Sequence, residues 1–297
     1  MSITREGHTA SVLTNGKVLV VGGSDNETNV LVTAELYDPS TGNWIITGNL
    51  QDTRVYHTAS VLLDGKVLVT GGAIHTVIRN TCELYDPSTG NWTQINSMHY
   101  GRTAHTASLL LDGKLLVTGG GGVNEYEILN ICELYDPSTG NWTKTHGMHY
   151  SRMCHTATVL TNGTVLVTNG LNSYLYFIIT NSTELYNPLI GNWTITDPLK
   201  EERCLHTASL LPNEKVLVIS GYNYRGPPFA DSRNSTELYD PLTGKWENQS
   251  RLKTIRSYHA TSVLKNGNIL VIGGDLGNGF GFALATCELY NSTMKSI

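Results

Sequence analysis

The sequence predicts an all-β protein built from six small antiparallel sheets, and three observations lead to this prediction. An Arg-x-x-His pair recurs six times along the 297 residues, at Arg5, Arg54, Arg102, Arg152, Arg203 and Arg256. Each pair is followed by the same order of short apolar runs and turns, with no helical periodicity. Three of the segment lengths are the same in every copy that contains them, which indicates that each copy folds in the same way.

Length differences between the copies are confined to one segment. The glycine that closes the second apolar run lies 18 residues after the Arg in all six copies. A Trp lies 9 residues after the Glu of a Glu-Leu-Tyr sequence, and the next Arg lies 10 residues after that Trp, wherever both residues exist. Only the stretch from the glycine to the Glu varies, between 11 and 16 residues. We therefore expect a uniform scaffold that carries one variable loop per copy.

Four strands are expected in each copy. The run after each His alternates polar and apolar residues, as a strand with one buried face does, and an Asn-Gly or Asp-Gly pair in most copies then favours a tight hairpin. A second, almost wholly apolar run follows, then a strand that ends in Glu-Leu-Tyr, an Asp-Pro-x-x-Gly turn and a strand that begins at the Trp. These features predict a six-bladed β-propeller of four-stranded antiparallel blades. The expected blades, within a single domain over residues 1–297, span approximately residues 5–47, 54–95, 102–145, 152–196, 203–249 and 256–297.

The last blade lacks a clear outer strand. Nine residues after Glu288, where the repeat places a Trp, stands Ile297, the last residue of the sequence. Either the last blade has three strands and an exposed outer edge, or the chain is a fragment of a longer protein. The sequence leaves both interpretations open.

The repeated residues resemble kelch repeats. Double glycines at 22–23, 71–72, 119–120 and 273–274, the Tyr of Glu-Leu-Tyr and the Trp after the turn recur in phase over nearly the whole chain. The first glycine is replaced by Asn169 and Ser220 in two copies. The resemblance implies a propeller that binds proteins, although galactose-oxidase-like members of this group are enzymes that bind copper with help from neighbouring domains.

Composition and charge exclude several classes of function. Hydrophobic residues make up 40% of the chain and charged residues 15%, which is typical of a globular protein. The net charge is −5 and there is no basic block, so we expect no nucleic-acid partner. No apolar stretch approaches the ~20 residues of a membrane span.

The variable loops are the expected binding face, because function usually lies on loops that a rigid scaffold positions. They comprise residues 24–34, 73–82, 121–132, 171–183, 222–236 and 275–287. The last three loops are rich in aromatic residues and Arg, which are typical of interaction hot spots. The candidate binding residues are Tyr174, Tyr176, Phe177, Tyr222, Tyr224, Arg225, Phe229, Arg233, Phe280 and Phe282. The alternative is that these side chains merely pack loop against loop.

The repeated Arg and His residues are expected to serve the scaffold. A single active site needs one constellation of residues and not six copies, so we expect each Arg to pair with the Glu of the third strand and each His to bond a backbone group. His99, His146 and His149 lie outside the repeated position, and a metal site there is a weaker alternative. We predict no catalytic residue, no metal and no cofactor.

The most specific functional hypothesis is a non-catalytic module that binds a protein or peptide partner through its variable loops. The alternative is a galactose-oxidase-like or other carbohydrate-binding or carbohydrate-modifying propeller enzyme. The five cysteines are expected to be reduced, which favours a cytoplasmic location. Nine Asn-x-Ser/Thr sequences leave an extracellular location open.

Overall fold

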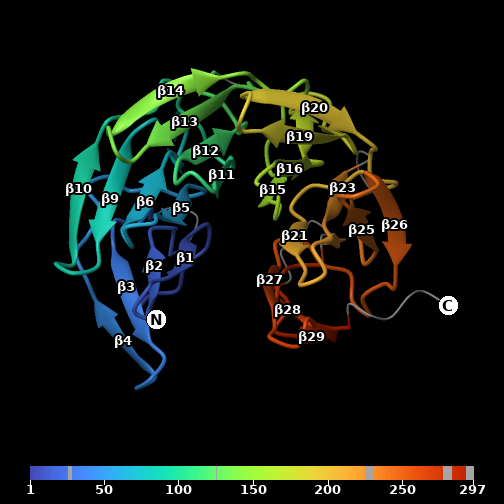
Figure 1. Cartoon of the computed structure of the whole chain (residues 1–297). Helices are drawn as coiled ribbons and strands as arrows, with labels where there is room; N and C mark the ends of the chain where they lie inside the picture. The colour runs from blue at the N-terminus through green and yellow to red at the C-terminus, as the bar shows by residue number, and fades with distance from the viewer. Residues whose placement is uncertain (26–28, 125, 225–229, 277–282, 292–297) are drawn as a thin grey trace. The chain divides into compact units, whose positions relative to one another are not determined.

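The computed structural model describes residues 1–25, 29–124, 126–224, 230–276 and 283–291 (Figure 1). The chain divides into two compact units, Met1–His146 and Gly147–Ile297, and each is described by itself. All regular structure in the described part of the chain is β-strand, as the sequence predicts. No helix long and apolar enough to cross a membrane occurs among these residues.

The first unit holds three four-stranded antiparallel sheets, which we call blades one to three, and one two-stranded ribbon. Blade one consists of β1 (Thr9–Val12), β2 (Val18–Val21), β3 (Ala34–Asp38) and β4 (Asn43–Ile46). Blade two consists of β5 (Thr58–Val61), β6 (Val67–Thr70), β9 (Cys82–Asp86) and β10 (Asn91–Ile95), and its ribbon of β7 (Ala73–Ile74) and β8 (Val77–Ile78). Blade three consists of β11 (Thr106–Leu109), β12 (Leu115–Thr118), β13 (Cys132–Asp136) and β14 (Asn141–Thr145).

The second unit holds blades four to six and two ribbons. Blade four consists of β15 (Thr156–Val159), β16 (Val165–Thr168), β19 (Thr183–Asn187) and β20 (Asn192–Thr196), with the ribbon β17 (Leu171–Ser173) and β18 (Ile178–Ile179). Blade five consists of β21 (Thr207–Leu210), β22 (Val216–Ile219), β25 (Thr236–Asp240) and β26 (Lys245–Gln249), with the ribbon β23 (Tyr222–Tyr224) and β24 (Ala230–Ser232). Blade six consists of β27 (Ala260–Val263), β28 (Ile269–Ile272) and β29 (Cys287–Tyr290).

The observed sheets confirm the predicted fold class. In every blade the strands pair in chain order, and Figure 1 shows this order clearly in the neighbouring arrows β1 to β4. Blade six has three strands in the described part of the chain, so the expected lack of an outer strand is also confirmed.

Three of the variable segments are ribbons, where the sequence analysis expected only loops. In all six blades the residue after the repeated Arg pairs with the residue after the closing glycine; Met153 with Leu171 and Cys204 with Tyr222 are examples. This pair holds the base of each variable segment. In blades two, four and five the pairing continues into the ribbons β7–β8, β17–β18 and β23–β24.

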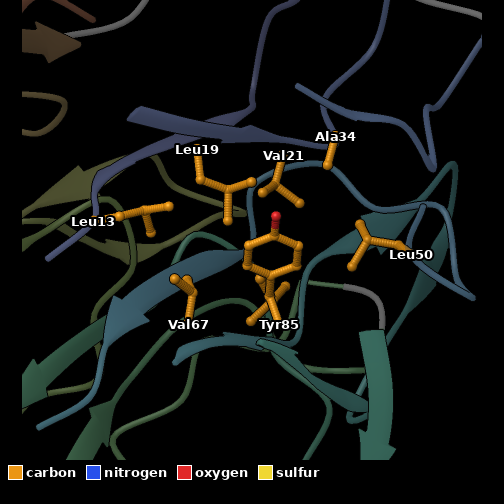
Figure 2. Close-up of a cluster of buried hydrophobic side chains, with 8 residues drawn as sticks. Leu13, Leu19, Val21, Ala34, Leu50, Val67 and Tyr85 are labelled. Atoms are coloured by element: carbon orange, nitrogen blue, oxygen red, sulfur yellow. The ribbon is translucent and has the colours of Figure 1, made fainter. Parts of the chain in front are cut away.

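The core of each unit lies between neighbouring blades. Between blades one and two, Leu19 and Val21 of β2 meet Val67 of β6 and the Tyr85 ring of β9, all almost fully buried (Figure 2). The second strand of blades two to five is buried along its whole length, as its apolar sequence predicts. Each Trp packs on the Tyr of its own blade, with ring centroids 5.0–5.1 Å apart. The Nε1–H of Trp142 also donates to the Asn96 carbonyl oxygen, which links blade three to blade two.

A buried Arg–Glu pair stands at the same place in every blade, as the sequence analysis predicts. The pairs are Arg5–Glu35, Arg54–Glu83, Arg102–Glu133, Arg152–Glu184, Arg203–Glu237 and Arg256–Glu288, with N–O distances of 2.7–2.9 Å. In blade three, Nη1 of Arg102 donates to the carbonyl oxygens of Gly119 and Ile131, which lie close to the two ends of the variable segment. The second oxygen of Glu133 accepts the backbone N–H of His99 in the incoming connection. One ion pair therefore fixes three segments of its blade.

Loss of one partner of this pair should destabilise the protein strongly. We predict that Arg102→Ala lowers the free energy of unfolding by about 3–5 kcal/mol, because the Glu133 carboxylate stays buried without its cation. Equilibrium unfolding in urea measures the change. The control is Lys114→Ala, whose exposed pair with Asp112 spans 3.9 Å, and it should cost less than about 1 kcal/mol. Equal effects of the two substitutions would contradict the structural role of Arg102.

Candidate functional site

The candidate site lies at the end of blades four and five that carries the variable segments. In blade four the incoming connection and the variable segment meet there, since the backbones of Met153 and Leu171 exchange two hydrogen bonds of 3.0 and 2.9 Å. The Asn187–Gly191 turn between β19 and β20 stands at the opposite end of this blade. The variable segment and the Asn187–Gly191 turn therefore lie at opposite ends of blade four, so substitutions in the turn can serve as controls for substitutions in the candidate site.

The tip of the β17–β18 ribbon brings three predicted binding residues together. Tyr174, Tyr176 and Phe177 are 44%, 77% and 43% exposed, and the rings of Tyr174 and Phe177 lie 5.8 Å apart between centroids. The intervening Leu175 and the following Ile178 are exposed as well. Five consecutive apolar residues thus face solvent at one ribbon tip. Phe177 has a φ of 47°, a left-handed conformation that is unfavourable for an aromatic residue and that shapes the turn.

Blade five contributes the neighbouring ribbon. Strand β23 contacts β18 of blade four, so the variable segments of these two blades lie side by side. Tyr222 at the start of β23 is half-buried and exchanges two backbone hydrogen bonds with Cys204. The backbone of Tyr224 pairs with that of Ala230. The structure therefore brings the predicted residues that it describes in blades four and five into one region.

Arg233 is held beside a carboxylate that the sequence analysis missed. Its Nε lies 3.8 Å from Oε2 of Glu201, which also lies 3.7 Å from Nη2 of Arg203 and accepts a 2.6 Å hydrogen bond from the Ser235 hydroxyl. Burial acts to raise the pKa of Glu201, but Ser235 and the cations Arg203, Arg233 and Arg251 together bring it below its ordinary value. The sequence signal was the acidic residue two positions before the repeated Arg, which recurs as Asp52 in blade two, where it lies 3.8 Å from Arg54.

Four predicted site residues fall outside the described part of the chain. They are Arg225, Phe229, Phe280 and Phe282. Their place in the candidate site stays a prediction.

Several of the repeated His residues join neighbouring blades within one unit. Nε2 of His57 lies 2.9 Å from Oγ1 of Thr9 in the preceding blade, and His206 and His259 make the same contact with Thr156 and Thr207, also at 2.9 Å. Burial, aided by nearby Arg54, lowers the pKa of His57 to about 3, although the Arg54 backbone acts in the opposite direction. Neutral, buried rings of this kind serve the scaffold. The sequence analysis did not identify the Thr partners.

Two His residues outside the repeated position also have carboxylate partners. Nδ1 of His99 lies 2.7 Å from Oε2 of Glu133, and Nδ1 of His149 lies 2.8 Å from Oε2 of Glu184. His146 is exposed. The described residues hold no group of three or more His, Cys, Asp or Glu side chains placed to bind a metal ion.

The two cysteines next to the candidate site are poorly suited to act as nucleophiles. Cys154 and Cys204 follow the repeated Arg closely in blades four and five, and both are free thiols. Burial raises the pKa of Cys154 to about 12, and burial with the nearby Cys154 raises that of Cys204 as well. Because the thiolate is the reactive form, these raised pKa values disfavour nucleophilic chemistry at the two thiols near neutral pH.

Comparison with known proteins identifies both a family and a fold. Residues 2–170 match the family described as the KLHDC2/KLHL20/DRC7 Kelch-repeats domain. No curated protein matches the sequence. The solved "Structure of YjhT" is similar to this chain with a TM-score of 0.77 and 17% sequence identity, over 97% of this chain and 95% of that chain. At this level of identity the similarity concerns the fold alone.

Buried neutral His residues should make the stability depend on pH. The folded protein keeps His57 neutral down to about pH 3, whereas His takes up a proton near pH 6.5 in an unfolded chain. The unfolded state therefore binds more protons between these values, and the free energy of unfolding falls as the pH falls, by up to about 1.4 kcal/mol per pH unit for one such residue. We predict a shallower slope for His57→Gln between pH 6.5 and pH 4, measured by urea unfolding.

The control for this prediction is Thr9→Val. It removes the hydrogen-bond partner of His57 but keeps the titrating ring. It should lower stability and leave the slope close to that of the wild type. An unchanged slope in His57→Gln would contradict the assignment of a neutral, buried ring.

Proposed function

Because the chain belongs to the KLHDC2/KLHL20/DRC7 Kelch-repeats domain family, we propose that it is a non-catalytic kelch propeller that binds a protein or peptide partner. The kelch propeller is a fold that serves protein interaction in general. The finer proposal is that the partner binds the variable segments of blades four and five, with Tyr174, Tyr176 and Phe177 as its anchors.

The exposed apolar tip of the β17–β18 ribbon is the observation that carries this proposal. Tyr176 is 77% exposed and lies within five consecutive exposed apolar residues. Contiguous apolar surface is costly to leave in water, and on soluble proteins it commonly marks an interaction site. Aromatic side chains also lose little conformational entropy for the large area that they bury in an interface.

The shape of this region favours a polypeptide partner over a small molecule. Small-molecule sites are concave and enclose most of their ligand. The ribbon tip instead presents its side chains outward, and the adjoining β23 provides neighbouring surface from blade five. A partner that spans both ribbons would contact aromatic side chains and the charged group around Arg233 and Glu201.

The engagement of the repeated polar residues supports a non-catalytic role. The six repeated Arg side chains have Glu partners, and His57, His206 and His259 have Thr partners. General acid–base catalysis needs a group that can reach its substrate, with a pKa near the working pH. Groups that are buried and paired within the scaffold do not meet that need.

Site-specific photo-crosslinking tests the proposal. A benzoylphenylalanine placed at Tyr176 in the intact protein should yield one discrete crosslinked polypeptide in cells, which mass spectrometry identifies. The matched control places the same group at Leu189, which is 93% exposed in the turn at the opposite end of blade four. Adducts at Leu189 and none at Tyr176 would contradict the proposed face.

Substitutions at the tip should then weaken binding of that partner without unfolding the protein. We predict that Tyr174→Ser, Tyr176→Ser and Phe177→Ser combined lower the affinity by at least about 30-fold, which corresponds to ~2 kcal/mol. The pair Leu189→Ser and Ile190→Ser is the control and should bind as the wild type does. Calorimetry measures both affinities and melting temperatures. A large drop in the melting temperature of the triple variant would instead indicate that these three side chains stabilise the fold by packing against neighbouring loops.

A further inference from the structure

Cys154 and Cys204 stand at two positions that the repeat brings together. Cys154 is the second residue after the repeated Arg of blade four, and Cys204 is the first residue after that of blade five. The N–H of Leu205 donates to the carbonyl oxygen of Cys154 at 3.2 Å. The connections that lead into these two blades therefore lie side by side at the two cysteines, both of which are free thiols.

Blades one and two show how closely the Cβ atoms at these two positions approach each other. Gly7 and Val55 are the corresponding residues, and the N–H of Tyr56 donates to the Gly7 carbonyl oxygen at 2.9 Å. Gly7 and Cys154 also share a left-handed backbone, with φ values of 60° and 53°. A Cβ added to Gly7 would lie 3.4 Å from the Cβ of Val55. Disulfides join Cβ atoms about 3.5–4.5 Å apart, so the repeat places this pair of positions close to the separation that a disulfide needs.

The other three cysteines stand at a different position of the repeat. Cys82, Cys132 and Cys287 each begin the third strand of their blades. The thiols of Cys82 and Cys132 are fully buried and donate to backbone carbonyl oxygens two residues before them. The repeat therefore offers no second pair of cysteines at the two adjoining positions.

We propose that Cys154 and Cys204 form a disulfide when the protein folds in an oxidising environment, with a small disulfide such as oxidised glutathione as the oxidant. One cysteine loses its proton, and its thiolate attacks the glutathione disulfide, which gives a mixed disulfide and releases one glutathione thiolate. The thiolate of the second cysteine then attacks the protein sulfur of the mixed disulfide and releases the second glutathione. Two electrons pass from the cysteines to glutathione, and the two protons end on its thiols.

The burial of both thiols places this reaction during folding. Burial raises the pKa of Cys154 to about 12, and it also raises the pKa of Cys204. Cysteines of an unfolded chain have a pKa of about 8.5 and form thiolate far more readily. The disulfide therefore forms before the two blades are fully packed, whereas the folded, reduced protein is oxidised slowly.

The bond would join the bases of two neighbouring ribbons. Met153, next to Cys154, exchanges two backbone hydrogen bonds with Leu171 at the start of β17, and Cys204 does the same with Tyr222 at the start of β23. A disulfide here closes a covalent ring of about 50 residues, which lowers the entropy of the unfolded chain. Oxidation should therefore stabilise the fold and fix the two ribbon bases to each other. This inference does not depend on the proposed function.

Mass spectrometry of the full chain tests for the bond. The protein is unfolded, reduced and refolded in a glutathione buffer with the oxidised form in excess, or with dithiothreitol as the reduced reference. Trypsin places Cys154 and Cys204 in separate peptides, 153–200 and 204–215. We expect these two peptides to be linked in the oxidised sample and separate after reduction. Free thiols at both positions, linkage through another cysteine or glutathione adducts at Cys287 alone would overturn the proposal.

Thermal unfolding measures the effect of the bond. The oxidised wild type should melt at least about 5 °C above the reduced wild type. Cys154→Ser and Cys204→Ser should each abolish this difference, whereas the control Cys287→Ser should retain it. The peptide analysis of the wild type remains decisive if a variant does not fold. Equal melting temperatures of the oxidised and reduced wild type would contradict a covalent link between the blades.

Discussion

The buried Arg–Glu pair is the interaction on which the rest of the structure depends. Arg102 and Glu133 are both fully buried, and charges in such a place are tolerated only when they are paired and hydrogen-bonded. The pair satisfies this condition by binding the carbonyl oxygens of Gly119 and Ile131 and the N–H of His99. Any shift of these segments would leave a buried charge without a partner. This constraint explains why the length from the Arg to the closing glycine is the same in all six copies.

The same pair also explains where the chain is free to vary. The carbonyl groups that Arg102 binds stand close to the two ends of the variable segment, so its ends are fixed whatever lies between them. Lengthening a loop whose ends are already held costs little, since the entropy of closure grows slowly with length. Blade four uses this freedom for a ribbon with an exposed aromatic tip, where Tyr176 is 77% exposed. The candidate site is thus built on the part of each blade that folding constrains least.

The sequence predicts the features that the repeat shares and misses those that belong to one blade. The Arg–Glu pairs and the strand order within each blade follow from residues that recur in phase. The ribbon β17–β18 does not, because its sequence occurs once and its pairing starts from the tertiary contact between Met153 and Leu171. The Thr9–His57 contact joins two blades, and the sequence does not state which side chains of neighbouring blades meet. Glu201, the partner of Arg233, escapes prediction for another reason: the sequence analysis paired the repeated Arg only with the Glu of the third strand and overlooked the acidic residue two positions before that Arg.

The variable segments depart from the repeat, and they therefore carry the functional argument. The tip of the blade-four ribbon adds exposed aromatic side chains, so recognition there depends on which of these groups a partner can cover. Blades of nearly the same sequence and structure offer a partner the same groups. A partner can therefore distinguish one blade from another only through the residues that differ between them. Where the copies are alike they stabilise the fold, and where they differ they can select a partner.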